Sequence, residues 1–432
     1  MRPGARLKAG EEILEDILVR HRPASIALAD WGKHHRFAGS GDRAAIGTLV
    51  YDALRRRKSI AARMGSDAPR ALVLGAALRA FAMTPEEVAG VADGSAYAIK
   101  RLSKEEAAAL ARELPHDAPA HIAGDFPEWI LPSLERAFGE RAGQEGAALS
   151  ARAPVDLRVN TLNATRENVV EALAHFAAEP TQLSPVGVRI PPPEGAGRAP
   201  HVEVEAAHGK GWFEVQDQGS QIAALLAGAT SNMQVLDLCA GAGGKTLALA
   251  AAMQNTGHIY AYDANKRQLR PIFERLKRAD VSNVQVMEAG DEAALVARGA
   301  CFDVVLVDAP CTGSGTWRRK PDSKWRLKPA NIGERQAEQK QVLALAAGLT
   351  KPGGCLVYVT CSVLPEENVD QVAAFLLAHP DFSVEPYAQA WKEHLGSEPP
   401  LSADGRDDTL QLTPACHGTD GFFIARLRRG SA

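Results

Sequence analysis

The last two hundred residues predict an α/β fold built on a mainly parallel sheet with helices on both faces. Short apolar segments alternate there with helical patterns, which is typical of parallel strands joined through helices. At 432 residues the chain exceeds one ordinary core, so we expect more than one domain. The candidate strands are Gln234–Leu238, His258–Tyr262, Val284–Glu288, Asp303–Val307 and Cys355–Val359.

Residues 1–120 are predicted to be helical. Apolar side chains recur at helical spacing over residues 46–54, and capping boxes begin at Thr84 and Ser103. The basic run at 55–58 is most often a solvated helix end, and an RNA-facing patch is the less frequent meaning.

Residues 121–225 predict a small α/β module. Val155, Leu157 and Val159 alternate with polar residues, as in a strand with one wet face. The remaining expected elements are a helix over Arg166–Ala177, strands at Val186–Ile190 and Val202–Glu205, and a loop over residues 191–200.

Composition favours a globular protein of the cytoplasm. The apolar fraction is 46% and the charged fraction 23%, and no apolar run approaches the ~20 residues that span a bilayer. The first twenty residues lack the apolar segment of a secretion signal. The six cysteines are expected to be thiols, and since none forms a CxxC pair we expect no metal. A net charge of −3 means that any nucleic-acid surface is a local patch.

The stretch "LDLCAGAGGKTLALA" joins the first strand of the sheet to a helix through a glycine-rich turn. The nucleotide-triphosphate pattern needs a glycine where Cys239 stands, and the dinucleotide pattern needs a third glycine where Thr246 stands. A near match alone is weak evidence for a nucleotide site, because any tight strand-to-helix turn can have a similar glycine-rich sequence.

The strands that follow supply the context for this turn. Asp263, Asp291 and Asp308 each come at the carboxyl end of a predicted strand, where open α/β sheets bind their ligands. A single acid at such a position is usually a solvated turn residue. It is the occurrence of all three acids at corresponding strand ends that indicates a ligand site. A ligand with a ribose and an adenine but no pyrophosphate fits this set, and S-adenosylmethionine is the natural candidate.

Two cysteines are predicted at the same edge of the sheet. Cys311 follows the fourth strand and Cys361 the fifth, whereas Cys301 and Cys355 are expected to be small buried side chains. A thiolate that adds to carbon 6 of a cytosine ring makes carbon 5 nucleophilic toward a sulfonium methyl group. A carboxyl group near N3 of the ring, which Asp308 can supply, would stabilise the adduct.

The segments "DLCAGAGGKT", "DAPCTGSGTWRRKPDSKWR", "VYVTCSVLPEEN" and "DGFFIARL", in this order, resemble the Sun/RsmB family of RNA cytosine carbon-5 methyltransferases. With "LRVNTLNATRE" and "FEVQDQGSQ" the resemblance covers roughly residues 121–430. It implies a Rossmann-like S-adenosylmethionine-dependent methyltransferase domain over 226–430 and a small α/β RNA-binding module over 121–225. It also implies an N-terminal all-α NusB-like RNA-binding domain over 1–120.

The resemblance also implies roles for individual residues. Cys361 is expected to be the nucleophile, Cys311 the group needed to release the methylated RNA, and Asp308 a group near the methyl and the base. Asp263 is expected to bind the ribose and Asp291 the adenine side. The turn around the methionine part of the cofactor is Cys239, Ala240, Gly241, Ala242, Gly243, Gly244 and Lys245, in which Gly241-Ala242 replaces the commoner Ala-Pro.

RNA contacts are expected in two places. Arg158 and Asn160 lie on the predicted polar face of the first strand of the small module. The segment 317–328 interleaves Trp317 and Trp325 with basic residues, which suits unpaired RNA better than a rigid duplex. Its expected RNA-binding residues are Arg318, Arg319, Lys320, Lys324 and Arg326.

The sequence therefore predicts an enzyme that makes 5-methylcytosine in RNA, most simply in small-subunit ribosomal RNA, after flipping the target base from its stack. Methylation of transfer RNA by the same chemistry stays open. A ribosome-assembly factor that binds RNA without catalysis is the other alternative, and the presence of both Cys311 and Cys361 speaks against it. We expect a monomer that works with RNA and without membrane or metal.

Overall fold

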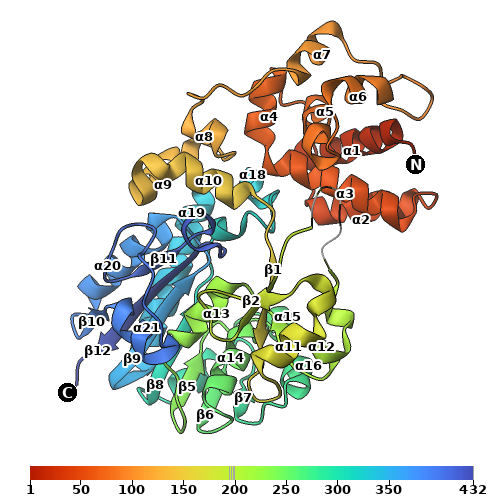
Figure 1. Ribbon diagram of the computed structural model, residues 1–432. Helices are drawn as coiled ribbons and strands as arrows, with labels where there is room; N and C mark the ends of the chain where they lie inside the picture. The colour runs from red at the N-terminus through yellow and green to blue at the C-terminus, as the bar shows by residue number, and fades with distance from the viewer. Residues whose placement is uncertain (194, 196, 198–199, 432) are drawn as a thin grey trace.

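The structure of the chain is a computed structural model that describes residues 1–193, 195, 197 and 200–431. A helical N-terminal part lies at the top of Figure 1 and two sheets lie below it. The predicted loop at 191–200 falls partly outside the described residues. In the described part, no helix combines the length and apolar character needed to cross a membrane.

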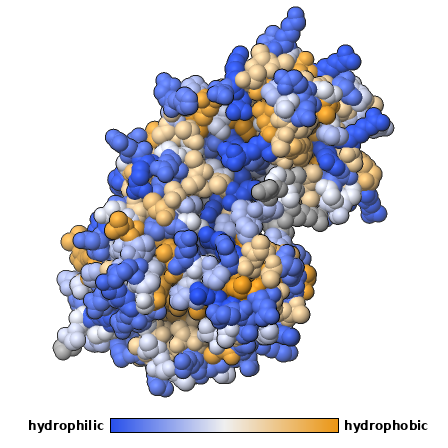
Figure 2. All heavy atoms as spheres, in the orientation of Figure 1, coloured by the Kyte–Doolittle hydropathy of each residue, from blue (hydrophilic) through white to orange (hydrophobic). Residues whose placement is uncertain are grey.

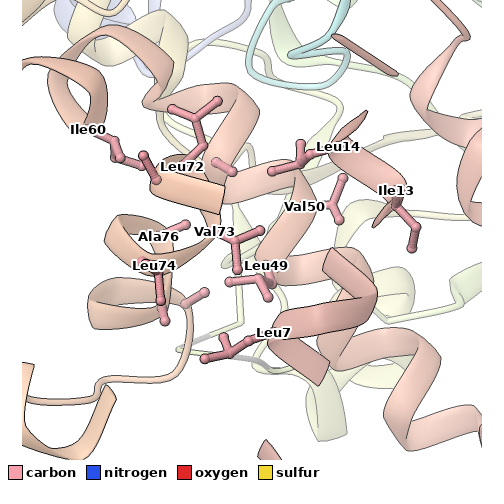
Figure 3. Close-up of a cluster of buried hydrophobic side chains, with 14 of the residues drawn as sticks. Leu7, Ile13, Leu14, Leu49, Val50, Ile60, Leu72, Val73, Leu74 and Ala76 are labelled. Atoms are coloured by element: carbon pink, nitrogen blue, oxygen red, sulfur yellow. The ribbon is translucent and has the colours of Figure 1, made fainter. Parts of the chain in front are cut away.

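The N-terminal part is a group of helices around its own apolar core. Leu7, Leu49, Leu72 and Val73 are fully buried in it (Figure 3). Both predicted capping boxes are confirmed, since Thr84 and Ser103 each accept a hydrogen bond from a backbone N–H three residues on. The helices are α1 (Pro3–Leu18), α2 (Ala24–His34), α3 (Ser40–Arg55), α4 (Arg57–Met64), α5 (Pro69–Ala80), α6 (Pro85–Val91) and α7 (Lys104–Leu110).

Three short helices connect this part to the rest of the chain. They are α8 (Ala120–Ala123), α9 (Leu131–Phe138) and α10 (Ala142–Ser150). Apolar side chains of α9 and α10 share one core with Trp317, Val363 and Leu364, which belong to the segments that follow Cys311 and Cys361. The connection is thereby packed directly against the region of the predicted active site.

The small module is a four-stranded antiparallel sheet in the order β2-β3-β1-β4. The prediction of a strand at Val202–Glu205 is wrong: Val202–Val204 is a single 3-10 turn, and the Val204 N–H bonds to the His201 carbonyl instead of a neighbouring strand. The elements are β1 (Val155–Val159), α11 (Arg166–Ala172), β2 (Glu179–Pro180), β3 (Gly187–Ile190), α12 (Ala206–Gly209) and β4 (Phe213–Val215).

The large sheet has the strand order β10-β12-β9-β8-β5-β6-β7, with β11 paired to β12. The five predicted strands are confirmed as the parallel part, and three antiparallel strands that were not predicted extend one edge. The strands are β5 (Gln234–Asp237), β6 (His258–Ala261), β7 (Val284–Val286), β8 (Phe302–Asp308), β9 (Thr350–Thr360), β10 (Phe382–Glu385), β11 (Leu410–Leu412) and β12 (Phe422–Arg429).

Helices cover both faces of this sheet, as the alternation predicted. Val304 faces the core formed with α13, α14 and α21, whereas its neighbour Val305 faces the core formed with α17, α19 and α20. The helices are α13 (Gln218–Leu225), α14 (Gly244–Ala252), α15 (Lys266–Leu269), α16 (Ile272–Arg278), α17 (Glu292–Val296), α18 (Ser323–Arg326), α19 (Pro329–Leu349), α20 (Val369–Ala378), α21 (Tyr387–Leu395) and α22 (Pro414–His417).

The waist between the upper and lower halves of the molecule is strongly hydrophilic in Figure 2. Charged and polar contacts cross it: the Arg55 guanidinium donates to the Arg318 carbonyl, and the Ala24 N–H donates to the Asp322 carboxylate at 3.3 Å. The N-terminal helices are thus joined to the part of the chain that carries the predicted active site by polar contacts as well as by the connecting helices.

Candidate active site

The glycine-rich turn after β5 is held open by backbone geometry. Gly243 has a φ of +82°, and a side chain there would meet Ile272 at 2.4 Å, so only glycine fits. The Asp263 carboxylate accepts hydrogen bonds from the N–H groups of Gly241 (2.9 Å) and Asn265 (2.7 Å). Asp263 therefore ties the end of β6 to the turn after β5.

A cleft of about 1100 Å³ opens beside this turn at the carboxyl ends of the strands. It has the size and partly apolar character of a small-molecule site. Gly243 is the only residue of the predicted turn that does not line it. The predicted residues along its wall are Cys239, Ala240, Gly241, Ala242, Gly244, Lys245, Asp263 and Asp308.

Asp291 does not line the cleft. Its carboxylate caps α17 by accepting the Ala294 N–H at 3.0 Å, and the side chain is exposed. Its neighbour Glu292 lines the cleft instead. The expectation that Asp291 binds the adenine side stays a prediction, since one carboxylate oxygen caps the short helix that follows.

Asp237 is a site residue that the sequence reasoning missed. Its carboxyl lies fully buried at the end of β5, lines the cleft and accepts a hydrogen bond from the Thr246 hydroxyl at 2.7 Å. Its other oxygen has no hydrogen-bond partner among the described residues. Burial raises the pKa of Asp237 to about 7. Its place just before the glycine turn was the available signal.

Lys245 reaches across the cleft from α14. Its ammonium group donates to the Asp308 carboxylate at 2.6 Å and lies 5.3 Å from the ring centre of Phe422. Asp308 remains about one third exposed, so one side of this carboxylate faces the open space. The ion pair fixes the position of the carboxylate next to Pro310, which also lines the cleft.

The two predicted cysteines converge at the same edge. Cys311 follows β8, Cys361 follows β9, and their sulfur atoms are 3.3 Å apart. Both residues are partly exposed. Neither cysteine lines the cleft itself. Cys311 directly follows Pro310, and Pro310 does line the cleft. The predicted convergence of the two thiols is confirmed.

Glu367 organises the loops that carry both sulfurs. One of its oxygens accepts from the Thr312 N–H (2.8 Å) and the Gln339 amide (3.2 Å). The other accepts from the Thr312 and Ser362 hydroxyls, both at 2.5 Å. Thr312 and Ser362 each follow one cysteine directly, so a single carboxylate holds both loops. The sequence reasoning missed Glu367, and the available signal was its place in the motif "VYVTCSVLPEEN" that also contains Cys361.

The pKa of Cys311 is raised well above its usual range, because its sulfur shares a hydrogen bond with Cys361 and is buried. Cys311 is therefore a thiol near neutral pH and can donate to the sulfur of Cys361. Cys239 on the cleft wall also remains a thiol, because burial and then the charge of Asp308 raise its pKa.

Four of the residues expected to contact RNA are buried. Arg158 donates to the Gln216 side chain at 2.7 Å and Asn160 to the Ala279 carbonyl at 2.9 Å. The expected wet face of β1 is covered by the catalytic half of the chain, so the expectation of exposure there is wrong. Arg318 is paired with Asp217 and Asp420, so it too is not presented to solvent.

Lys324 is the fourth buried residue. It donates to the Arg55 carbonyl (2.8 Å) and the Ser150 hydroxyl (2.7 Å), so it serves the contact with the N-terminal helices. Arg319 is partly exposed and paired with Asp217 at 2.8 Å. Lys320 and Arg326 are exposed.

The basic run at 55–58 is not a simple solvated helix end. Arg55 lies at the contact between the two halves, where burial lowers its pKa to about 10. Trp325 packs against the N-terminal core and Trp317 is buried, so neither tryptophan of segment 317–328 stands free in solvent. Over the described residues, no group of three or more His, Cys, Asp or Glu side chains could hold a metal ion.

A mainly parallel sheet covered on both faces, a glycine turn after its first strand and a cleft walled by strand-end acids fit an S-adenosylmethionine-dependent methyltransferase. Residues 223–428 match the family model of the 16S rRNA methyltransferases RsmB/F, and residues 126–194 match the ferredoxin-like domain of RsmF/B-like methyltransferases. The chain belongs to the RsmB/F methyltransferase family, which confirms the resemblance seen in its motifs.

Individual relatives agree with this assignment. The ribosomal RNA small subunit methyltransferase B of Sodalis glossinidius is 32% identical over 353 residues, which cover 81% of this chain and 74% of the relative. The probable ribosomal RNA small subunit methyltransferase B of a Synechocystis species is 31% identical over 309 residues, covering 70% of this chain and 67% of the relative. A solved methyltransferase homolog from Pyrococcus horikoshii is 27% identical, with a TM-score of 0.59 over 72% of this chain and 97% of that one.

Proposed function

We propose that this enzyme methylates carbon 5 of a cytosine in small-subunit ribosomal RNA through a covalent adduct on Cys361. The observation that carries the proposal is the 3.3 Å separation of two sulfur atoms at the edge of the methyl-donor cleft. Membership of the RsmB/F family and relatives named ribosomal RNA small subunit methyltransferase B support the ribosomal substrate.

The residues of the cleft fit S-adenosylmethionine, which supplies a sulfonium methyl group when bound. Each oxygen of Asp263 accepts one backbone N–H and keeps a lone pair for a ribose hydroxyl. Asp237 also lines this space, and among the described residues one of its buried oxygens has no hydrogen-bond partner. Gly241 has open space where a side chain would stand, so the turn leaves room for the methionine part.

The chemistry proceeds in two stages that leave the enzyme unchanged. The Cys361 thiolate forms a bond to carbon 6 of the flipped cytosine, and the ring electrons pass to carbon 5. Carbon 5 then takes up the methyl group as the bond between that group and the donor sulfur breaks. In the second stage a base removes the proton from carbon 5, the bond between sulfur and carbon 6 breaks, and the thiolate is restored.

Cys311 and Asp308 act beside the nucleophile. The thiol of Cys311 donates a hydrogen bond to the Cys361 sulfur while that sulfur carries negative charge, and it serves the release of the product. The Lys245 ammonium holds the Asp308 carboxyl toward the open space, from which it contacts the ring near N3. Glu367 keeps the two sulfurs in place and does not touch the base.

Two cysteine variants test this mechanism. Cys361→Ala is expected to abolish both methylation and the covalent adduct, because no sulfur is left to attack carbon 6. Cys311→Ala is expected to leave RNA bound covalently to the protein as a slowly migrating species in denaturing gels. A covalent adduct on the Cys361→Ala variant would instead show that Cys311 is the nucleophile and Cys361 the group that serves product release.

The substrate is tested by incubating the protein with labelled donor and separate RNA pools. Label in ribosomal RNA of the small subunit, located at 5-methylcytosine by mass spectrometry, is the expected result. Label confined to transfer RNA would overturn the ribosomal assignment. No label in any pool would favour a binding protein without catalysis.

A further inference from the structure

A second pocket lies where the N-terminal helices meet the segment that follows Cys311. It has a volume of about 710 Å³ and is bordered by α4, the chain before α9, and α18. Its walls include Trp129 and Trp325, the cations Arg57 and Lys58, and the acids Asp67 and Glu128. Nothing in the methyl-transfer chemistry described above uses this pocket.

Trp325 forms a rigid wall of the pocket. Its indole N–H donates to the Leu54 carbonyl at 2.6 Å, so the ring is fixed to the end of α3. The charged ends of Lys324 and Arg57 lie 4.9 Å and 5.4 Å from its ring centre. A ring held in this way loses little freedom when a ligand binds against it.

Trp129 supplies the accessible aromatic surface. It is 37% exposed and belongs to the short turn before α9. An indole with a free face stacks with any nucleobase, because each base presents a π-face. The next residue, Ile130, is fully buried in the core that also contains Trp317 and Val363, which anchors this turn.

The charges of the pocket suit a nucleotide better than a simple anion. Arg57 is paired with Asp67 at 3.1 Å, whereas the side chain of Lys58 has neither a hydrogen bond nor an ion pair among the contacts of the described residues. Lys58 is therefore available to a phosphate. Glu128 is exposed and can accept a hydrogen bond from the amino group of a base.

We propose that this pocket binds an unpaired nucleobase of the RNA substrate, stacked on Trp129, with its phosphate at Lys58 and its amino edge toward Glu128. The proposal rests on the proposed function, because it assumes that the substrate is RNA. The pocket holds a nucleotide away from the target cytosine and anchors the RNA across both halves of the protein.

The test measures binding of an unstructured twelve-nucleotide RNA to the full chain by fluorescence anisotropy, without methyl donor. Trp129→Ala is expected to weaken binding roughly five- to hundredfold, and Trp129→Phe to retain most of it. Lys58→Ala is expected to weaken binding and to lower the salt dependence by about one unit of slope. Tyr97→Ala, which removes an 82% exposed ring elsewhere, and Lys100→Ala are matched controls expected to bind like the wild type.

Unchanged binding by Trp129→Ala and Lys58→Ala would overturn the proposal, and so would a wild type that does not bind this RNA. Photo-cross-linking with 4-thiouridine RNA is expected to label the peptides that contain Trp129 or Trp325, and labelling only elsewhere would overturn it. Because these measurements need no methyl transfer, a failure of the pocket and a failure of the proposed chemistry give different results. RNA that binds through the pocket but is never methylated would refute only the chemistry.

Discussion

Glu367 shows how much of the active site depends on one side chain. It is fully buried, burial raises its pKa, and four donors from three segments converge on it. Two of those segments carry Cys311 and Cys361. The carboxylate is therefore a positioning group for both sulfurs.

We expect Glu367→Ala to lower the free energy of unfolding by about 3 kcal/mol, since charge-assisted hydrogen bonds are lost and buried donors are left unpaired. Methylation should slow by about a hundredfold, because the sulfurs are no longer aligned. The rate at which diamide oxidises Cys311 and Cys361 to a disulfide should fall as well, which a purely global loss of stability would not cause under native conditions. Glu366→Ala, whose carboxylate accepts from Ser133 at 2.8 Å, is the control and should oxidise like the wild type.

Asp237 makes stability depend on pH in a defined direction. Its pKa is about 7 in the folded protein and about 4 in an unfolded chain, so between these values only the folded state keeps the proton. The contribution of Asp237 to the free energy of unfolding therefore falls as pH rises from 4 to 7, by up to about 4 kcal/mol.

We expect Asp237→Asn to remove this loss, because an amide does not ionise and its oxygen can still accept from Thr246. Thermal melts should show the variant more stable than the wild type at pH 8 and similar to it at pH 4. Asp291→Asn is the matched control at an exposed helix cap and should follow the wild type at both pH values. Equal melting of Asp237→Asn and wild type at pH 8 would contradict the raised pKa.

At the scale of elements, the site depends on three segments that approach without side chains between them. The Gly315 N–H donates to the Cys361 carbonyl at 3.0 Å, and the Gly421 N–H donates to the Gly315 carbonyl at 2.8 Å. A side chain on Gly315 would meet the Gly421 carbonyl oxygen at 2.1 Å. That obstacle is backbone, so a rotamer change cannot relieve it.

Gly315→Ala is therefore expected to separate these segments and to destabilise the protein by roughly 1–3 kcal/mol. The rate of methylation should fall with it, since the loop after Cys361 moves. Gly333→Ala in α19 has open space around the added methyl and should stabilise the protein by about 0.5–1 kcal/mol. Thermal melts and methylation rates are measured for both variants. A loss of stability and rate in Gly315→Ala alone assigns the effect to local crowding and not to the loss of a glycine in general.

The elements also show where sequence patterns suffice. Strands β5 to β9 were predicted because each is a short apolar run followed by turn residues at a regular distance. Strands β10 to β12 were missed, because the prediction relied on the alternation of strands and helices that parallel pairing requires, and these strands pair antiparallel outside that alternation. The polar face predicted for β1 was buried by a neighbouring unit that no local pattern indicates.

At the scale of the whole molecule, Lys324 joins three parts of the chain. Its ammonium group reaches α3 and α10 while its backbone belongs to α18 after Cys311. Burial lowers its pKa to about 7 and raises the pKa of the neighbouring Asp125. Lys324 is therefore charged in the unfolded chain, whereas its burial at the contact between the halves disfavours the charged form in the folded protein.

An unfolded chain keeps the lysine proton up to about pH 10, whereas the folded protein releases it near 7, so stability should rise with pH between these values. We expect the free energy of unfolding of the wild type to gain roughly 2–3 kcal/mol from this residue between pH 7 and 9. Lys324→Met should lack that gain in chemical denaturation. Lys320→Met, at an exposed lysine of the same segment, should keep it, and a gain in both variants would assign the effect to another group.

The sequence by itself determined the class of fold, the family, the glycine turn and the two cysteines. These follow from local patterns and from motifs whose order can be seen in a single sequence. Tertiary structure alone decided which charges are exposed. Arg158, Arg318 and Lys324 look like RNA contacts in the sequence and are buried partners of other segments in the fold. Burial depends on which distant segments pack together. The same packing placed Glu367 between the two loops that carry the cysteines and formed the pocket at Trp129.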